Sequence, residues 1–204
     1  MQKDIIMPRF NSETLITHLK NEAKDIFSVF NEKIKDLEEE ILNVRPEKNK
    51  WSALECVEHL NMVGRYYLPR MEAEINKAIL KGSKSQIEFK SGFMGNYMYN
   101  AMKPTSDRSI QNKMKTFKSV NPAEKYNMSK LDAEIVIKNF KEQQQQYLNL
   151  LEKGKQVDLN SVKITSLIGP ILKLKIGDVY RFLLGHIERH LIQAENAFKE
   201  KNYA

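Results

Sequence analysis

Two of the four histidines in this chain, His186 and His190, lie four residues apart in the segment GHIERHLIQAE. The surrounding apolar pattern predicts a helix, and positions four apart share one face of a helix, with side chains about 6 Å apart. A helical wheel places both histidines among the apolar positions, on the face that is expected to be buried. Two buried imidazoles either find separate hydrogen-bond partners or share one metal ion, and neutral imidazole is the form that binds metal. This segment alone leaves both interpretations open.

Two common catalytic motifs are not present around these histidines. HIERH lacks the glutamate directly after the first histidine that the HExxH zinc motif requires, and Glu188 falls on the opposite side of the wheel. The sequence has no Gly-x-Ser-x-Gly elbow and no glycine-rich phosphate-binding loop. Neither zincin chemistry nor a serine–histidine–acid triad is therefore predicted.

The other two histidines lie away from the centre of their apolar stripes. His59, in ECVEHL, lies at the edge of a stripe, from where a side chain can still face a cleft between two helices. Its position alone favours a boundary residue over a ligand. His18 is also off-centre and is predicted not to bind metal. Cys56 is expected to be a small core residue, although its place one turn before His59 leaves a ligand or supporting role open.

Four helical segments are expected to position these residues. Ser52 and Glu55 form a capping-box pattern at the start of the second segment, and Pro69 predicts a kink or break inside it. There is no internal repeat and no convincing strand alternation. The sequence predicts an all-α fold, a four-helix bundle in a single domain over residues 1–204. The expected helices cover residues 12–43, 52–82, 129–154, and 178 to near the carboxyl terminus.

A long connection, residues 82–128, joins the second and third predicted helices. A structureless loop of this length is unusual inside a compact domain, so we expect the segment to pack over one end of the bundle. Its portion SGFMGNYMYNAM could form a short helix. The residues expected to anchor it are Phe89, Phe93, Tyr97, Tyr99 and Phe117.

The composition is that of a globular protein that is rich in helix. Hydrophobic residues make up 41% and charged residues 29% of 204 residues, with 8 glycines and 6 prolines. The net charge is +7, but lysines alternate with acids, as in NEKIKDLEEE, which indicates solvated helix faces and disfavours a nucleic-acid partner. There is no signal-peptide pattern in MQKDIIMPRF, no run long enough to cross a membrane, and a single cysteine. A cytoplasmic protein is therefore expected.

Two segments resemble the DinB-like (YfiT-like) superfamily. KWSALECVEHL (50–60) resembles the family's W-S-x-x-E start of helix two with its following H-L, and GPILKLKIGDVYRFLLGHIERHLIQAE (169–195) resembles its closing segment with H-x-x-x-H and then Gln. The order of four long helices with a long second connection agrees, so the resemblance spans most of the chain. It implies a divalent metal, most often nickel or zinc, bound by His59, His186 and His190. Three histidines would leave coordination positions open for water or substrate.

The resemblance implies less about the reaction. Some relatives resemble transferases or isomerases that use bacillithiol, mycothiol or another low-molecular-weight thiol, and others are called metal-dependent hydrolases. The leading expectation is a metal-dependent thiol transferase acting on a small electrophile. The alternatives are a hydrolase with a metal-activated water and a non-catalytic metal-binding interaction protein. Glu55, Glu188 and Arg189 are candidates to act around the site, a small molecule is the expected substrate, and the resemblance makes a homodimer plausible.

Overall fold

The computed structural model describes residues 7–111 and 114–199. Residues 1–6 of the segment MQKDIIMPRF and residues 112–113 of the long connection lie outside the described residues. The elements in chain order are β1 (Arg9–Asn11), α1 (Ser12–Lys33), α2 (Glu39–Asn43), α3 (Ala53–Leu80), β2 (Glu88–Lys90), α4 (Phe93–Met102), the 3-10 turn η1 (Lys118–Val120), α5 (Pro122–Lys125), α6 (Ala133–Gly154), β3 (Lys163–Ser166), β4 (Gly169–Lys175) and α7 (Ile176–Lys199).

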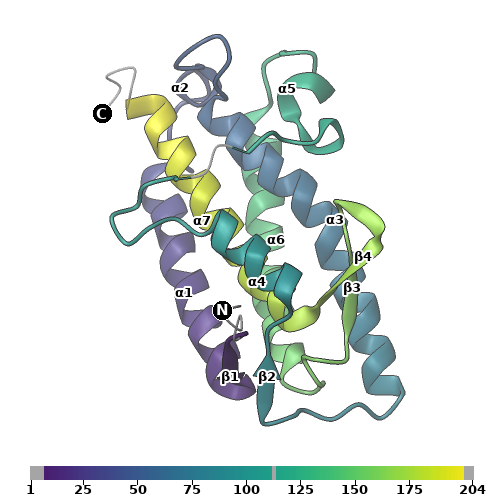
Figure 1. Cartoon of the computed structure of the whole chain (residues 1–204). Coiled ribbons are helices and arrows are strands. Elements are labelled where there is room, and N and C mark those ends of the chain that lie inside the picture. Colours follow the sequence, from purple (N-terminus) through teal and green to yellow (C-terminus); the bar gives the residue numbers. More distant parts are fainter. Residues whose placement is uncertain (1–6, 112–113, 200–204) are drawn as a thin grey trace, which may run out of the picture.

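Four long helices, α1, α3, α6 and α7, pack around a shared apolar core (Figure 1). Both α6 and α7 contact α3 on one side and α1 on the other. Buried residues recur at three- and four-residue spacing, as with Leu15, Leu19 and Ile26 on α1, which is the pattern of an amphipathic helix. The predicted mostly helical fold is confirmed, whereas the extent of one domain over residues 1–204 stays a prediction. Within the described residues, no helix is both long and apolar enough to cross a membrane.

The start of α3 has the capping box that the sequence predicts. The Ser52 hydroxyl accepts a hydrogen bond from the Glu55 amide at 3.1 Å, and the Glu55 carboxylate accepts one from the Ser52 amide at 2.9 Å. Arg45 pairs with the same carboxylate. The helix then runs through Pro69 to Leu80, so of the two outcomes predicted at Pro69 a break is wrong, and a kink stays a prediction. These contacts fix the residue at which α3 begins. They therefore also fix the position along the helix axis of the side chains on its first turns.

Replacing Ser52 with alanine should lower the free energy of unfolding by about 1–2 kcal/mol, because the buried amide of Glu55 loses its acceptor. Urea unfolding followed by circular dichroism measures this change. Ser28→Ala is the matched control, because the Ser28 hydroxyl donates only to a carbonyl of its own helix. An equal loss in both variants would contradict the capping role.

The first predicted helix ends earlier than expected. It stops at Lys33, and the short helix α2 follows after a turn, so the prediction of one helix over residues 12–43 is wrong. The apolar spacing of α1 continues into the turn, because Ile34 is buried in the core. Past the turn the periodicity no longer identifies the buried side chain, since Leu42 is buried whereas Ile41, which the spacing favours, is only partly buried.

Two small antiparallel sheets correct the purely helical prediction. In the first, β1 pairs with β2, with Arg9 opposite Lys90 and Asn11 opposite Glu88. In the second, β3 pairs with β4, with Lys163 opposite Lys175 and Thr165 opposite Lys173. β4 passes directly into α7, so this hairpin is attached to the start of the last helix without a loop.

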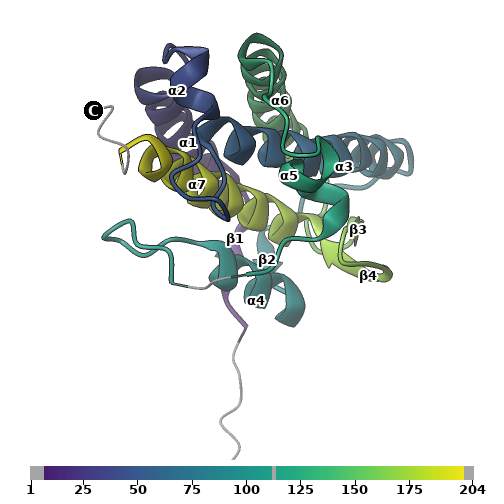
Figure 2. The same cartoon turned by 90° about the horizontal axis from the view of Figure 1, so that it is seen from above.

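The long connection covers the side of α7 as well as one end of the four long helices. Helix α4 packs on the face of α7 that points away from the other long helices (Figure 2), and η1 and α5 contact α3. The short helix is confirmed, but the predicted anchors are only partly right. Phe89 is fully buried and Tyr99 partly buried, whereas Phe117 is half exposed. Phe93 and Tyr97 are more than half exposed, because α4 turns Gly95 and Met98 inward instead.

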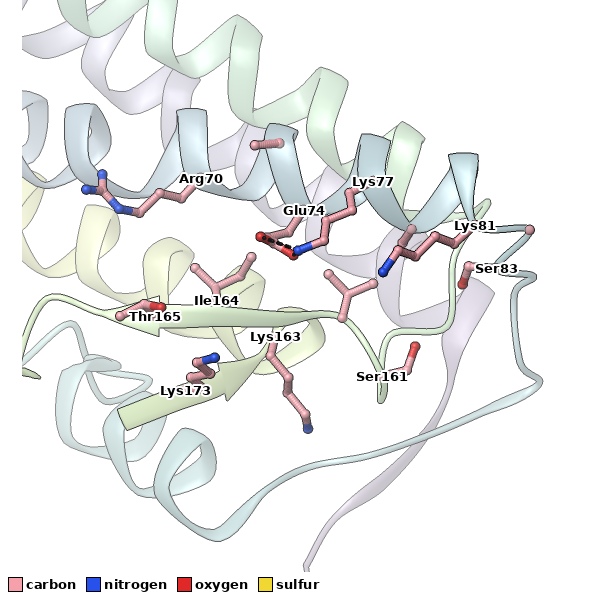
Figure 3. A pocket seen from close by; sticks show the side chains of 14 residues that line it. Arg70, Glu74, Lys77, Lys81, Ser83, Ser161, Lys163, Ile164, Thr165 and Lys173 are labelled. Carbon is pink, nitrogen blue, oxygen red and sulfur yellow. Dashed lines mark hydrogen bonds and ion pairs between the residues drawn. The ribbon is translucent and has the colours of Figure 1, made fainter. Parts of the chain in front are cut away.

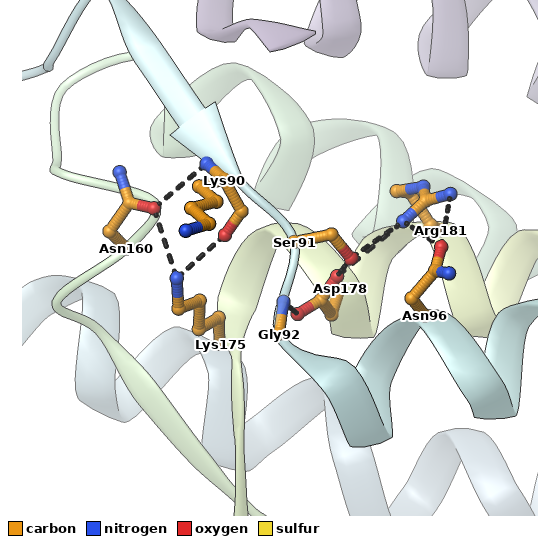
Figure 4. A network of polar contacts seen from close by, with 8 residues as sticks. All are labelled: Lys90, Ser91, Gly92, Asn96, Asn160, Lys175, Asp178 and Arg181. Carbon is orange, nitrogen blue, oxygen red and sulfur yellow. Dashed lines mark hydrogen bonds and ion pairs between the residues drawn. The ribbon is translucent and has the colours of Figure 1, made fainter. Parts of the chain in front are cut away.

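A network of polar contacts links the segment from β2 to α4 with the start of α7 (Figure 4). The buried carboxylate of Asp178 accepts hydrogen bonds from the Ser91 hydroxyl and, at 2.8 Å, from the Gly92 amide. Arg181 donates to Ser91 at 3.0 Å and reaches Asn96 on α4. Burial raises the pKa of Asp178, and these hydrogen bonds act against that rise. The network fixes α4 and β2 against the first turns of α7.

Candidate metal centre

Three histidines from two helices come together in the core. His59 on α3 meets His186 and His190 on α7, and one nitrogen from each ring lies within 4.8 Å of the other two. The ring centroids of His190 lie 4.5 Å from those of both other histidines. All three side chains are buried. The i, i+4 pair and the more distant His59 therefore form one cluster of imidazoles.

The orientation of His59 is set by the main chain of the long connection. Its Nδ1 lies 2.6 Å from the carbonyl oxygen of Val120 in η1. A carbonyl only accepts hydrogen bonds, so Nδ1 carries the proton and Nε2 keeps its lone pair. That lone pair points at the other histidines, because Nε2 lies 3.1 Å from Nε2 of His186. η1 also explains why His59 is 4% exposed although the wheel placed it at an edge.

His190 is oriented by a residue on its own helix. Its Nδ1 lies 3.0 Å from Oε1 of Gln193, so Nδ1 donates to the amide oxygen and Nε2 is free to accept. The ring of Trp51 lies 5.0 Å from His59 and 5.9 Å from His190, and the ring of Phe182 lies 5.7 Å from His186. Aromatic side chains thus form two walls of the cluster.

The spacing of the nitrogens fits a shared cation. Two imidazole nitrogens that bind one zinc ion at about 2.0–2.1 Å lie roughly 3–3.4 Å apart, and the Nε2 atoms of His59 and His186 are 3.1 Å apart. Two lone pairs at this distance repel, so either a proton or a cation must lie between them. The residues present can therefore hold a metal ion, with one Nε2 donor from each helix facing the other.

His186 also lines a small, mostly apolar cavity on the side of α6. Its Nδ1 is buried and has no hydrogen-bond partner among the described residues, and the same holds for Nε2 of Gln144 on α6. Both residues line a cavity of about 30 Å³, which is room for one water molecule. With Nε2 turned toward a cation, Nδ1 would carry the proton toward this cavity.

Burial keeps all three imidazoles uncharged. It lowers the pKa of His59 to about 4, and the hydrogen bond to Val120 acts in the opposite direction. Burial also lowers the pKa of His186 and of His190 far below the usual range, with smaller contributions from neighbouring histidines and from Arg189. Neutral imidazole is the form that binds metal, so no proton has to be removed near neutral pH.

The other candidate residues lie outside this cluster. His18 is exposed on α1, with its Nε2 3.8 Å from Glu22, and that it binds no metal stays a prediction. Cys56 is fully buried, which raises the pKa of its thiol and makes it a core residue. The carboxylate of Glu55 is used by the capping box and by Arg45. Partial burial raises the pKa of Glu188, the nearby charge of Glu22 raises it further, and Lys103 acts against that rise.

Sequence reasoning missed three contributors to the site. The Val120 carbonyl left no signal, because a main-chain acceptor can belong to any residue type. Trp51 and Gln193 did have a signal, since both stand in the two segments that carry the family resemblance. Their contacts with the imidazoles now give those positions a physical role.

Comparison with known proteins gives a family but no individual relative. The family model of the DinB superfamily matches residues 27–194, a stretch that contains all three clustered histidines, the first motif and the second motif up to Ala194. No curated protein and no solved structure matches the chain. The match covers well over half of the sequence, and it agrees with the helical fold and with the arrangement of the histidines. The chain belongs to the DinB superfamily.

Proposed function

We propose that this chain is a four-helix-bundle enzyme that binds a divalent metal through His59, His186 and His190 and transfers a low-molecular-weight thiol, of the bacillithiol type, to a small electrophile. One observation carries the proposal: three buried, uncharged imidazoles from two helices converge, with donor nitrogens at a spacing that suits one ion. A donor set of imidazoles alone suits zinc or nickel. Such a set also leaves coordination positions for a reactant.

The absence of an acid from the cluster favours a thiol over water as the nucleophile. A hydrolase needs a nearby base to work with an activated water, and no carboxylate belongs to the described cluster. A thiol brings its own nucleophilic sulfur and needs only to lose its proton. A divalent ion bound here would act as a Lewis acid that stabilises the thiolate near neutral pH.

The protein's own residues would orient the donors and keep water away. Val120 and Gln193 hold protons on the outward nitrogens of His59 and His190, and the Trp51 and Phe182 rings cover the imidazoles. In the reaction with a chlorinated aromatic, the thiolate sulfur forms a bond to the ring carbon as the carbon–chlorine bond breaks. Chloride leaves with the electron pair, and the thiol proton passes to solvent.

The test combines metal content with a conjugation assay on protein purified without an affinity tag. We expect about one zinc or nickel ion per chain and chloride-releasing conjugation of bacillithiol to chlorodinitrobenzene that stops on metal removal and returns with metal. His59→Ala should lose both metal and activity, whereas His18→Ala should keep both. Conjugation at the same rate without metal would contradict the proposal.

The same preparation separates the alternatives. Turnover of nitrophenyl esters without added thiol would favour a metal-dependent hydrolase. Stoichiometric metal with no turnover in either assay would favour a non-catalytic metal-binding protein. A cytoplasmic location and a homodimer remain proposals that rest on composition and on the family.

A further inference from the structure

A second cavity lies far from the histidines, between the carboxyl-terminal half of α3 and the β3–β4 hairpin (Figure 3). Its volume is about 640 Å³, within the range of about 300–1,000 Å³ that is typical of small-molecule sites. The nearest lining residue on α3, Arg70, is three turns from His59, or roughly 16 Å along the helix. This cavity, the hairpin groove, is therefore separate from the histidine cluster.

The hairpin groove has a strong excess of positive charge. Figure 3 shows Arg70, Lys77 and Lys81 along the α3 wall and Lys173 on the opposite wall, whereas the Lys163 ammonium points away from α3. These five basic residues and a single acidic residue, Glu74, line the groove, and the Lys163 charge is the one directed away from the α3 wall. Such an arrangement favours an anionic ligand.

Most of these cations have no acidic partner in the protein. Lys77 pairs with Glu74 at 3.3 Å. Within residues 7–111 and 114–199, Arg70, Lys81 and Lys173 form no ion pair with a carboxylate. Arg70 instead packs over the ring of Tyr66, 3.9 Å from its centroid. The positive charge of the groove is thus left for a ligand or solvent to balance.

The crowding of cations extends along the hairpin. Partial burial lowers the pKa of Lys163, and the charge of Lys175, its partner across the strands, lowers it further. A helix carboxyl terminus attracts cations, which accounts for Lys77 and Lys81 at the end of α3. It does not account for Lys173 and Lys163, which come from a different element.

The floor of the groove is apolar. Val162, just before β3, and Ile164 on β3 are buried, and Ala73 and Ala78 of α3 also line the groove. A ligand that satisfies both the cations and the floor carries several negative charges on one part and an apolar or planar group on another. We propose that the hairpin groove binds a small organic phosphate, such as a nucleotide, at a site distinct from the metal centre. Lysine and arginine are the side chains that phosphate groups favour.

Titration calorimetry with ATP, at low salt and without divalent ions, tests the proposal on the full chain. We expect one molecule bound per chain, with affinity falling as salt is added. Neutralising one cation from each wall, in Lys81→Gln/Lys173→Gln, should weaken binding by at least about tenfold. The charge-preserving Lys81→Arg/Lys173→Arg should bind within about threefold of wild type, because its charges remain.

The matched control is Lys24→Gln/Lys141→Gln, which removes the same net charge from exposed positions on α1 and α6. It should bind ATP as the wild type does. Equal weakening in the control would show non-specific attraction and overturn the proposal, as would adenosine binding as tightly as ATP. Displacement of ATP by a short DNA duplex at lower concentration would assign the groove to nucleic acid and also overturn it. Thermal unfolding of each variant shows that the comparisons are made on folded protein.

Discussion

Replacing His186 with alanine is expected to weaken zinc or nickel binding by at least about a hundredfold. Loss of a residue that only supports a ligand typically costs 10–100-fold in metal affinity, and loss of the ligand itself costs more. His186 Nε2 lies 3.1 Å from His59 Nε2, so its removal leaves the α3 donor without its close partner. Competition with a metal-binding dye measures the affinity of the folded protein. The same change at His59 or His190 should have an effect of similar size.

His18→Ala is the matched control for this series, because His18 is exposed and lies outside the cluster. It should keep the affinity of the wild type. Since His186 is buried, the metal-free variants must also be compared by urea unfolding, so that loss of fold is not mistaken for loss of a ligand. His186→Asn, which fills more of the space than alanine, serves as the second variant. Full metal occupancy in both His186 variants would show that the ligand assignment is wrong.

The metal-free protein is expected to lose stability steeply as the pH falls from about 6.5 to about 4. The pKa of His59 is lowered from 6.5 to about 4 in the folded state, so between these values the unfolded chain binds more protons than the folded one. Stability from this group is therefore complete above pH 6.5 and is lost on acidification. The lowered pKa of His59 alone corresponds to about 3 kcal/mol. His186 and His190 change stability in the same direction.

Urea unfolding in the presence of a chelator, at several pH values across this interval, measures the effect. His59→Gln should show a shallower fall, because one of the titrating groups is gone. Asp178 and Glu188, whose pKa values are raised, work in the opposite sense, and because both proteins contain them they cancel in the difference between the two curves. That difference reports His59 together with its effect on His186 and His190. Identical pH dependence in the two proteins would contradict the buried, uncharged state of His59.

The sequence predicted the helices well because burial and helix periodicity coincide over long stretches. Short local patterns also predicted the capping box at Ser52 and the start of the last helix near Ile176. They did not predict the turn after Lys33, because Ile34 continues the apolar spacing of α1 into the core. Strands of three to seven residues are too short to show a clear alternation, which is why both small sheets were missed.

The three histidines could be named from sequence, but their geometry could not. The wheel placed His186 and His190 correctly on a buried face. It failed for His59, because a wheel considers one helix at a time, whereas His59 is also in contact with Val120 of η1, about sixty positions further along the chain. The prediction that His59 of α3 lies beside His186 and His190 of α7 came from the family motifs, and the distances between their nitrogens agree with it. The hairpin groove had no sequence signal, because it forms between α3 and strands that were not predicted.

The hydrogen bond from His59 to Val120 makes the centre sensitive to chain length more than to residue identity at that point. The acceptor is a peptide carbonyl, so any residue at position 120 would supply it. Adding or removing one residue beside Val120 would instead move the carbonyl away from Nδ1 and release the imidazole to rotate. The part of the long connection around Val120 must therefore keep its length, so that its carbonyl stays within hydrogen-bond distance of Nδ1 of His59.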